Sequence, residues 1–320
     1  MPQVALRWLD KDGALHQGDA TDLDSSAEEG MYWLWIDVTD PDETTLAQVQ
    51  ARFDLHELAV EDAAHPQHRA KLDPYPNGLF LAWLTPEHPR GDGVTSRELD
   101  VFMGERYLVT LHGGPNPAVD AVAHGMGSAI AAGPAWALHK IIDVLVDSTL
   151  PLVDRIGEQL STIEDRMLDN PRQNDLRDLH RVRRQLVRLH RILGPERDLL
   201  RGLARESDFV DDDAYRYFQD VGDHLARALD SVETYQDVGA SVMDVFLSAQ
   251  NNRMNAIMKQ LTVVATIFMP LTLISGIFGM NLVLGMWPPV TRTWSFAAVI
   301  GGMLAIAAVM AIYFRKKDWW

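Results

Sequence analysis

The sequence contains no cysteine, and this absence excludes disulfide bonds and thiolate metal sites from its 320 residues. Positive charge is also scarce, because 29 Lys and Arg stand against 45 Asp and Glu. Binding to nucleic acid depends on clustered Lys and Arg that neutralise phosphates. The charge balance therefore predicts that nucleic acid is not a partner.

Signals for catalysis and for ATP hydrolysis are missing too. No glycine-rich phosphate loop is present, so the sequence does not indicate an ATP-driven pump. Three histidines, His56, His65 and His68, lie near Glu61 and Asp62, but their spacing fits no standard zinc site. The N-terminus has no apolar stretch long enough for a signal peptide. We predict that the protein is not an enzyme.

Charge is absent from two long stretches in the last quarter of the chain. No charged residue lies between Lys259 and Arg292, and none lies between Arg292 and Arg315. Each stretch holds the roughly 20 apolar residues that cross a hydrocarbon core of about 30 Å. They predict membrane-spanning helices at about 261–279 and 294–314; the alternative is a pair of buried helices in a soluble core.

Basic residues flank the two spans on one side. These residues are Arg253, Lys259, Arg315, Lys316 and Lys317, whereas the connecting loop carries only Arg292. Positively charged residues favour the cytoplasmic side of a membrane. We therefore expect a protein of the cell inner (plasma) membrane whose two termini are both cytoplasmic.

The first 135 residues have the composition of an α/β domain. Two segments, 42–53 and 55–65, have helical patterns, and the first is opened by Asp40-Pro41 and Glu43. Strands interleaved with short helices indicate a mixed sheet with helices packed on it. The predicted strands are 4–9, 32–38, 78–85, 98–104 and 106–113.

From about residue 135 the pattern is almost entirely helical. A helix over 135–169 ends at Asn170-Pro171, and a helix over 173–205 returns antiparallel after a short turn. The second helix is rich in arginine, which we interpret as charge pairing with acids of the first helix. The residues concerned are Arg177, Arg181, Arg183, Arg184, Arg188 and Arg191, with Glu158, Glu164, Asp165 and Asp169.

Three aspartates at 211–213 precede a third and much longer helical stretch. Aspartate at a helix start interacts favourably with the helix dipole, and we prefer this interpretation to a metal site. No proline follows until Pro270, so a helix over 212–279 would be roughly 100 Å long. A lone helix of this length is not stable, so it must pack against copies of itself or against the other helices.

One face of this long helix mixes polar, small and apolar residues at a mean spacing close to 3.5. We call it the seam, and its residues are Asn255, Met258, Leu261, Ala265, Met269, Thr272, Gly276 and Gly279. Small and polar residues let membrane helices pack closely. The same residues can line a pore, where polar rings hold hydrated ions and apolar rings close by dewetting. The spacing does not decide between these two interpretations.

Asn281 lies just beyond the seam at the outer end of the first span. Two spans are too few to enclose a pore, so a channel would have to be an oligomer. A ring of Asn281 carbonyls, with backbone carbonyls freed at the helix end, could bind a cation that keeps most of its water, as magnesium prefers. The seam has no His or Cys, which argues against a dehydrated site for a soft metal.

The stretch "MKQLTVVATIFMPLTLISGIFGMN" (258–281) ends in Gly-Met-Asn, the chain has a two-span layout, and its basic end reads "YFRKKDWW". In these features the chain resembles the CorA family of divalent-cation transporters, of which Gly-Met-Asn is the signature. The stretch "VEDAAHPQHRAKLD" (60–73) is similar to an N-terminal motif of the family, with His68-Arg69-Ala70-Lys71 in place of Gln-Arg-Pro-Lys. The resemblance extends over the whole chain.

The resemblance implies a funnel-shaped homopentamer in a lipid bilayer that carries magnesium and cobalt. Its selectivity filter would be Gly279, Met280 and Asn281, its polar pore positions Asn255, Thr272 and Gly276, and its hydrophobic gate Met258, Leu261 and Met269. It also implies regulatory magnesium between cytoplasmic parts of neighbouring subunits. Asp220 falls at the matching position on the long helix, with Glu87 and Asp92 as candidate partners, although Asp220 could equally be a solvated carboxylate.

Two departures leave other functions open. Many relatives have an acid in the outer loop, whereas "LVLGMWPPVTRTW" has none and contains Arg292. A zinc transporter of the ZntB branch, with or without proton coupling, is one alternative. A membrane-anchored sensor or scaffold is the other, although a plain anchor has no need of the seam.

The expected organisation is an α/β domain, a helical stalk and two C-terminal spans. The segments are a cytoplasmic α/β domain (1–135), a cytoplasmic helical domain (136–260), a first span that forms the pore (261–281), an outer loop (282–293), a second span (294–314) and a basic tail (315–320).

Overall fold

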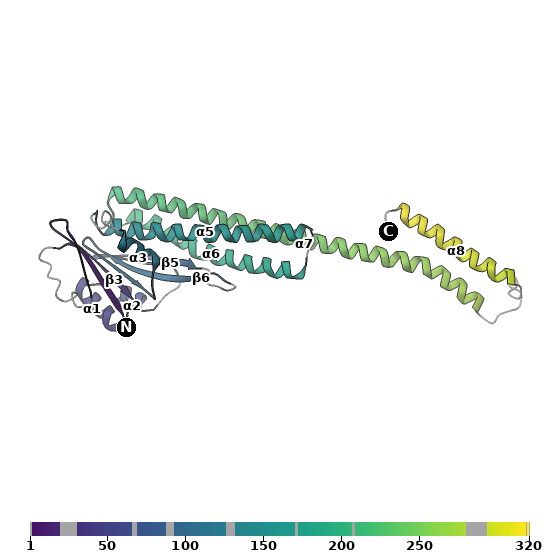
Figure 1. Cartoon of the computed structure of the whole chain (residues 1–320), viewed down its shortest axis with the longest axis horizontal. Coiled ribbons are helices and arrows are strands. Elements are labelled where there is room, and N and C mark those ends of the chain that lie inside the picture. The colour runs from purple at the N-terminus through teal and green to yellow at the C-terminus, as the bar shows by residue number, and fades with distance from the viewer. Residues whose placement is uncertain are drawn as a thin grey trace. The chain divides into compact units, whose positions relative to one another are not determined.

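The chain was analysed as a computed structural model, shown in Figure 1. It describes residues 2–19, 31–65, 69–87, 93–125, 132–169, 172–206, 209–279, 293–317 and 319. The chain divides into two compact units, Met1–Val242 and Met243–Trp320. The division falls within one helix, whereas the sheet and the helices that precede the division belong to the first unit.

The first unit is built on a mixed sheet of seven strands in the order β2-β1-β3-β7-β6-β5-β4. Neighbouring strands are antiparallel except for β3 and β7, which run parallel. The strands are β1 (Gln3–Asp10), β2 (Leu15–Asp19), β3 (Met31–Thr39), β4 (Lys71–Tyr75), β5 (Gly78–Glu87), β6 (Thr95–Met103) and β7 (Tyr107–His112).

All five predicted strands are present, as β1, β3, β5, β6 and β7. The sequence prediction missed β2 and β4, which form the two edges of the sheet. The first of these, "LHQGD", is short and polar, and the second contains Pro74. Proline is tolerated on edge strands because it removes a ladder donor, so neither segment has the apolar pattern of a central strand.

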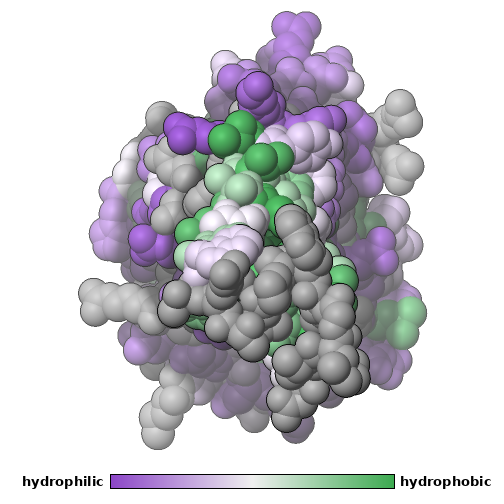
Figure 2. All heavy atoms as spheres, turned by 90° about the vertical axis from the view of Figure 1, so that its right-hand side faces the viewer, coloured by the Kyte–Doolittle hydropathy of each residue, from purple (hydrophilic) through white to green (hydrophobic). Residues whose placement is uncertain are grey.

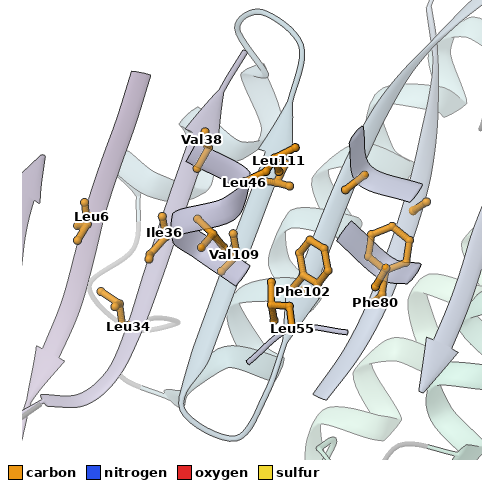
Figure 3. Close-up of a cluster of buried hydrophobic side chains, with 14 residues drawn as sticks. Leu6, Leu34, Ile36, Val38, Leu46, Leu55, Phe80, Phe102, Val109 and Leu111 are labelled. Atoms are coloured by element: carbon orange, nitrogen blue, oxygen red, sulfur yellow. The ribbon is translucent and has the colours of Figure 1, made fainter. Parts of the chain in front are cut away.

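Two short helices, α1 (Glu43–Phe53) and α2 (Glu57–Ala64), cover one face of the sheet, as predicted. Asp42 begins α1 because its Oδ1 accepts the backbone N–H of Thr45 at 2.8 Å. Leu46 of α1 and Ala59 of α2 pack onto alternate residues of the strands. Figure 3 shows this cluster, in which side chains from β1, β3, β5, β6 and β7 point to the same side of the sheet.

The opposite face of the sheet is covered by longer helices. These are α5 (Pro134–Asp169) and α6 (Gln173–Glu206). A short helix that the sequence analysis did not predict, α3 (Pro117–His124), packs against α5. Residues that alternate with the first cluster, among them Trp33, Trp35 and Trp83, are fully buried here. Helices α5 and α6 lie side by side (Figure 1), so the predicted helix pair is confirmed.

A buried polar network joins the parallel strands β3 and β7. Trp35 Nε1 donates to Thr110 Oγ1 at 3.0 Å, and that hydroxyl donates to Asp37 Oδ1 at 2.6 Å. His112 Nε2 lies 3.1 Å from the same carboxylate oxygen. Burial lowers the pKa of His112, but the hydrogen bond and the charge of Asp37 outweigh it, so the pKa of His112 stands above its ordinary value.

Candidate pore helix and regulatory carboxylates

The candidate site is carried by α7 (Asp212–Gly279), a single uninterrupted helix of 68 residues. Asp211 begins it, because its Oδ1 accepts the backbone N–H of Ala214 at 2.6 Å. This contact confirms the interpretation of the aspartates at 211–213 as a helix start. At about 1.5 Å per residue the helix is roughly 100 Å long.

The second half of α7 and the helix α8 (Thr293–Lys316) are long and apolar enough to cross a membrane. Almost no residue of their apolar windows is buried within the chain. The helices of a soluble core would be covered by their own chain, so this exposure argues against the soluble alternative. In Figure 2 apolar side chains gather in the part of the view that the ends of these helices occupy.

Within the second unit, α7 and α8 each cover a single stripe of the other. On α7 the covered or half-covered residues are Val263, Thr266, Ile267, Pro270, Leu271, Ile274 and Phe278, and on α8 they are Val299, Met303, Ala307, Met310, Ala311 and Phe314. With 3.6 residues per turn, the seam lies on the opposite side of α7 from this stripe. The seam is therefore free to meet other copies of the chain.

Every seam residue is exposed in the single chain. The three residues of the expected hydrophobic gate are more than half exposed, at 53% for Met258, 62% for Leu261 and 72% for Met269. An exposed apolar residue of a membrane helix can face either lipid or another helix, and other residues of α7, such as Phe268 at 62%, are equally exposed. The small and polar members of the seam are what favour a contact between helices. Asn255 continues the seam beyond the expected span.

The polar seam residue Thr272 already has its hydroxyl proton engaged. Its Oγ1 donates to the backbone oxygen of Phe268 at 2.9 Å, a bond that threonine often makes inside helices. The lone pairs of Oγ1 then remain available as acceptors. A ring of such oxygens would accept hydrogen bonds from the water molecules around a cation.

The two seam glycines have empty space around them in the single chain. A Cβ atom added to Gly276 or Gly279 would meet no heavy atom within 4 Å. Packing within the chain therefore gives no reason for glycine at either position. Gly279 ends α7, and the other two residues of the expected filter, Met280 and Asn281, lie outside the described residues.

Asp220, the expected regulatory carboxylate, lies on the part of α7 that belongs to the first unit. Its side chain is 73% exposed, and its Oδ2 lies 3.8 Å from Nε2 of His224 one turn later. The other ring nitrogen of His224 lies 3.9 Å from Asp147 on α5. An exposed carboxylate with one distant partner suits a hydrated cation, so the donor chemistry of Asp220 fits a regulatory magnesium.

Of the two candidate partners of Asp220, Glu87 forms an ion pair within the chain and Asp92 is not described by the structure. Glu87 Oε1 accepts an ion pair from Arg97 at 2.9 Å on the neighbouring strand. A guanidinium bound to this carboxylate competes with any cation, so Glu87 does not fit a metal site in this conformation. Asp92 lies outside the described residues.

Sequence reasoning missed that His224 lies between two carboxylates, those of Asp220 and Asp147. The spacing of Asp220 and His224 by four residues was a signal that could have been used. Asp147 could not have been found, because only the packing of α5 against α7 brings it close. The described part of the chain holds no group of three or more His, Asp or Glu that is arranged to bind a metal.

Three relatives align with nearly the whole chain. The putative metal ion transporter YfjQ of Bacillus subtilis is 33% identical over 90% of this chain and 90% of its own. The cobalt/magnesium transport protein CorA of Thermotoga maritima is 30% identical over 89% of this chain and 83% of its own. The zinc transport protein ZntB of an Enterobacter strain is 27% identical over 100% and 97%.

The fold matches a solved structure equally fully. The CorA magnesium transporter of Methanocaldococcus jannaschii superposes with a TM-score of 0.83 at 22% identity, covering 99% of this chain and 98% of that one. The family model described as "CorA-like Mg2+ transporter protein" matches residues 30–316. The chain therefore belongs to the CorA-like Mg2+ transporter family, whose members are membrane-embedded ion transporters and not enzymes.

Proposed function

We propose that this chain is a passive influx channel for magnesium and cobalt that works as a homopentamer. The observation that carries the proposal is the seam, which is exposed along α7 on the side opposite α8. Five copies that meet along this face would enclose a path lined by one helix from each subunit. Helix α8 would then lie on the outside, against the lipid.

Along that path, rings of hydrogen-bond acceptors would alternate with rings of apolar side chains that can close the pore. Rings of Asn255, Thr272 and Gly276 would contact the hydration shell of the ion, and rings of Met258, Leu261 and Met269 would close the path by dewetting when they approach the axis. Gly279, Met280 and Asn281 would form the entrance filter, which binds magnesium with its water retained. A hydrated ion needs no charged ligand in the pore, in keeping with the uncharged seam.

The driving force is the membrane potential, which acts on both charges of the ion. With the termini on the cytoplasmic side of the inner membrane, a potential that is negative inside favours entry by roughly 4.6 kcal/mol per 100 mV for a divalent cation. Internal magnesium would limit this entry by binding at Asp220 between subunits and holding the closed arrangement. No ATP is consumed.

The decisive experiment is magnesium entry into proteoliposomes that contain the purified protein and an internal magnesium-sensitive dye. We expect fast entry that falls as internal magnesium is raised and that is lost in Asn281→Ala. A folded, oligomeric protein through which no divalent ion moves would overturn the proposal and favour a membrane-anchored sensor or scaffold.

Zinc is the second candidate ion, because ZntB zinc transport proteins are among the relatives that align over the full chain. In the same vesicles, entry of zinc without magnesium, increased by an inward proton gradient, would assign the chain to zinc uptake. The same experiment with cobalt would test the remaining ion.

A further inference from the structure

A hollow of about 820 Å³ lies in the first unit between α6 and the beginning of β6. This volume is within the range of about 300–1,000 Å³ that small-molecule sites occupy. Among the residues that the structure describes, its lining is basic and includes no Asp or Glu. The residues are Gly93, Val94, Ser96, His180, Arg183, Arg184, Gln185, Val187, Arg188, Arg191 and Ile192.

The four arginines of this arginine hollow were expected to pair with acids of α5, and they do not. Among the described residues, no ion pair or hydrogen bond is formed by Arg183, Arg184, Arg188 or Arg191. The ion pairs that join or flank α5 and α6 involve other arginines, such as Arg166 with Asp178 at 3.2 Å. Four guanidinium groups thus repel one another across one hollow.

Helix geometry explains why these arginines gather. Positions 184, 188 and 191 follow one another by four and three residues and so share one face of α6. The stem of Arg183 reaches the same hollow from the side, held against α7, where its Cγ lies 3.4 Å from a Cβ built on Gly239. In a chain with a net charge of −16, this positive face is a local exception that attracts anions.

The floor of the hollow has an additional unsatisfied group. Gln185 is only 4% exposed, and its Oε1 has no hydrogen-bond partner in the described part of the chain. A buried amide oxygen without a donor costs free energy. This oxygen has almost no accessible surface, so a ligand would recover that free energy by donating to it once the Gln185 side chain turns toward the hollow. Val94 and Ile192 beside it are buried and apolar, which suits the uncharged portion of a ligand.

The positive surface continues past the arginine hollow. Arg191 also lines a second hollow of about 770 Å³, to which Arg69, Lys71 and Arg197 contribute. In that second hollow the positive charges are partly neutralised, since Lys71 pairs with Asp73 at 2.7 Å and Arg197 with Asp198 at 2.9 Å. The arginine hollow is therefore the stronger anion site.

We propose that the arginine hollow binds an anion with a chain of two or more phosphate groups, of the size of a nucleoside triphosphate. Guanidinium groups bind phosphate oxygens in bidentate pairs. Positions 183 and 191 lie roughly 12 Å apart along α6, a spread that matches a chain of phosphates better than one phosphate. The phosphates would lie on Arg184, Arg188 and Arg191, and the nucleoside of a nucleotide would extend toward Gln185 and Val94. Inorganic polyphosphate shares the phosphate chemistry and lacks the second contact.

The test is isothermal titration of the full-length purified oligomer in detergent, with EDTA present and salt near the physiological 0.15 M. The probes are ATP, inorganic tripolyphosphate and orthophosphate. We expect saturable binding of at least one of the first two and much weaker binding of orthophosphate. The variant Arg184→Gln with Arg188→Gln should weaken binding at least roughly tenfold, since each lost charged hydrogen bond costs about that factor or more.

The matched control is Arg177→Gln, which removes an exposed, unpaired arginine of the same helix outside the hollow. It should bind as the parent protein does. The absence of binding by both polyphosphates, or an equal loss in Arg177→Gln, would overturn the proposal. Size-exclusion chromatography confirms that the variants remain folded oligomers.

Two further outcomes identify the source of the phosphates, and both support the site. Tighter binding of ATP than of tripolyphosphate, removed by Gln185→Leu, indicates a nucleotide. Equal binding of the two, unchanged in Gln185→Leu, indicates polyphosphate. Because binding is measured without any ion flux, the result is independent of the proposed transport.

Discussion

The hydroxyl of Thr272 donates to the backbone oxygen of Phe268 at 2.9 Å, one turn earlier on α7. This bond fixes the direction in which the remaining lone pairs of the hydroxyl point. The same kind of bond is made by Thr266, whose Oγ1 donates to the oxygen of Thr262 at 2.6 Å, but Thr266 lies toward the α8 stripe. The pair provides a matched comparison of on-seam and off-seam hydroxyls.

We predict that Thr272→Val reduces magnesium entry at least several-fold, because valine keeps the shape of threonine and removes its acceptor. Thr272→Ser should retain most of the activity. Entry into proteoliposomes measures both. Thr266→Val should leave entry close to that of the parent protein, and an equal reduction in this control would mean that the seam hydroxyl has no special role.

Gly276 should be needed for assembly or conduction and not for the folding of a single chain. Since a Cβ at this position meets nothing within the chain, Gly276→Val should still insert into membranes and yet reduce ion entry at least tenfold, or lower the fraction of oligomer. Gly301→Val on α8 is the control, because Gly301 is also unobstructed and lies away from the α7-facing stripe. Crosslinking and ion flux measured on the same sample separate the two effects.

Asp220→Asn should weaken the inhibition of entry by internal magnesium. The substitution keeps the shape of the side chain and removes the charge that would hold the cation, so the concentration that halves entry should rise several-fold. The control is Asp230→Asn, another exposed carboxylate of α7. An unchanged inhibition curve for Asp220→Asn would show that Asp220 is an ordinary solvated carboxylate.

Glu87→Gln should not change the inhibition of ion entry by internal magnesium, because the Glu87 carboxylate is already ion-paired with Arg97. The exposed pair contributes little to stability, so the variant should also melt near the parent temperature. If inhibition weakened as much as in Asp220→Asn, the ion pair with Arg97 would have to open when magnesium binds.

The free energy of unfolding should fall as the pH rises from about 4 to about 8, because the buried Asp100 on β6 holds a proton that the unfolded chain releases. Burial raises the pKa of Asp100 to about 8, and the charges of Glu98 and Asp62 add to this. An unfolded aspartate loses its proton near pH 3.9, so between these values the folded state binds the extra proton. In this range Asp100→Asn should flatten the pH dependence and raise the melting temperature at pH 8 by several degrees.

Scanning calorimetry of the detergent-purified protein at pH 5, 6.5 and 8 measures this effect. Asp100 Oδ1 has no hydrogen-bond partner among the described residues, so asparagine loses no contact made by that oxygen. A melting temperature that drops equally at all three pH values would indicate instead that the carboxylate is needed for packing.

Local pattern was sufficient to predict much of the fold. The central strands β3 and β5 are apolar runs buried on both faces. Asp211, one of the three aspartates expected at a helix start, does begin α7, whereas α1 is capped by Asp42 and not by the predicted Asp40. The charge-free stretches located the ends of α7 and α8. The edge strands were missed because their contacts, and not their composition, make them strands.

The site was predictable along one helix and unpredictable between helices. The seam follows from spacing within α7 alone. Among the described residues, the predicted pairing with acids on α5 is not made by Arg183, Arg184, Arg188 or Arg191. A charge pattern does not say how each helix is rotated when the two pack together. Asp147 beside His224 and the ion pair of Glu87 with Arg97 also depend on contacts between elements that no single segment encodes.

The unbroken course of α7 along the whole seam means that the number of residues between two seam positions sets the angle between them. One residue inserted between Leu261 and Ala265 would turn the later seam residues by about 100° relative to Asn255 and Met258. Seven inserted residues would restore the phase to within about 20° while lengthening the helix by roughly 10 Å. The protein should therefore tolerate an inserted heptad far better than a single inserted residue, because the heptad lengthens the helix and leaves the seam on one face.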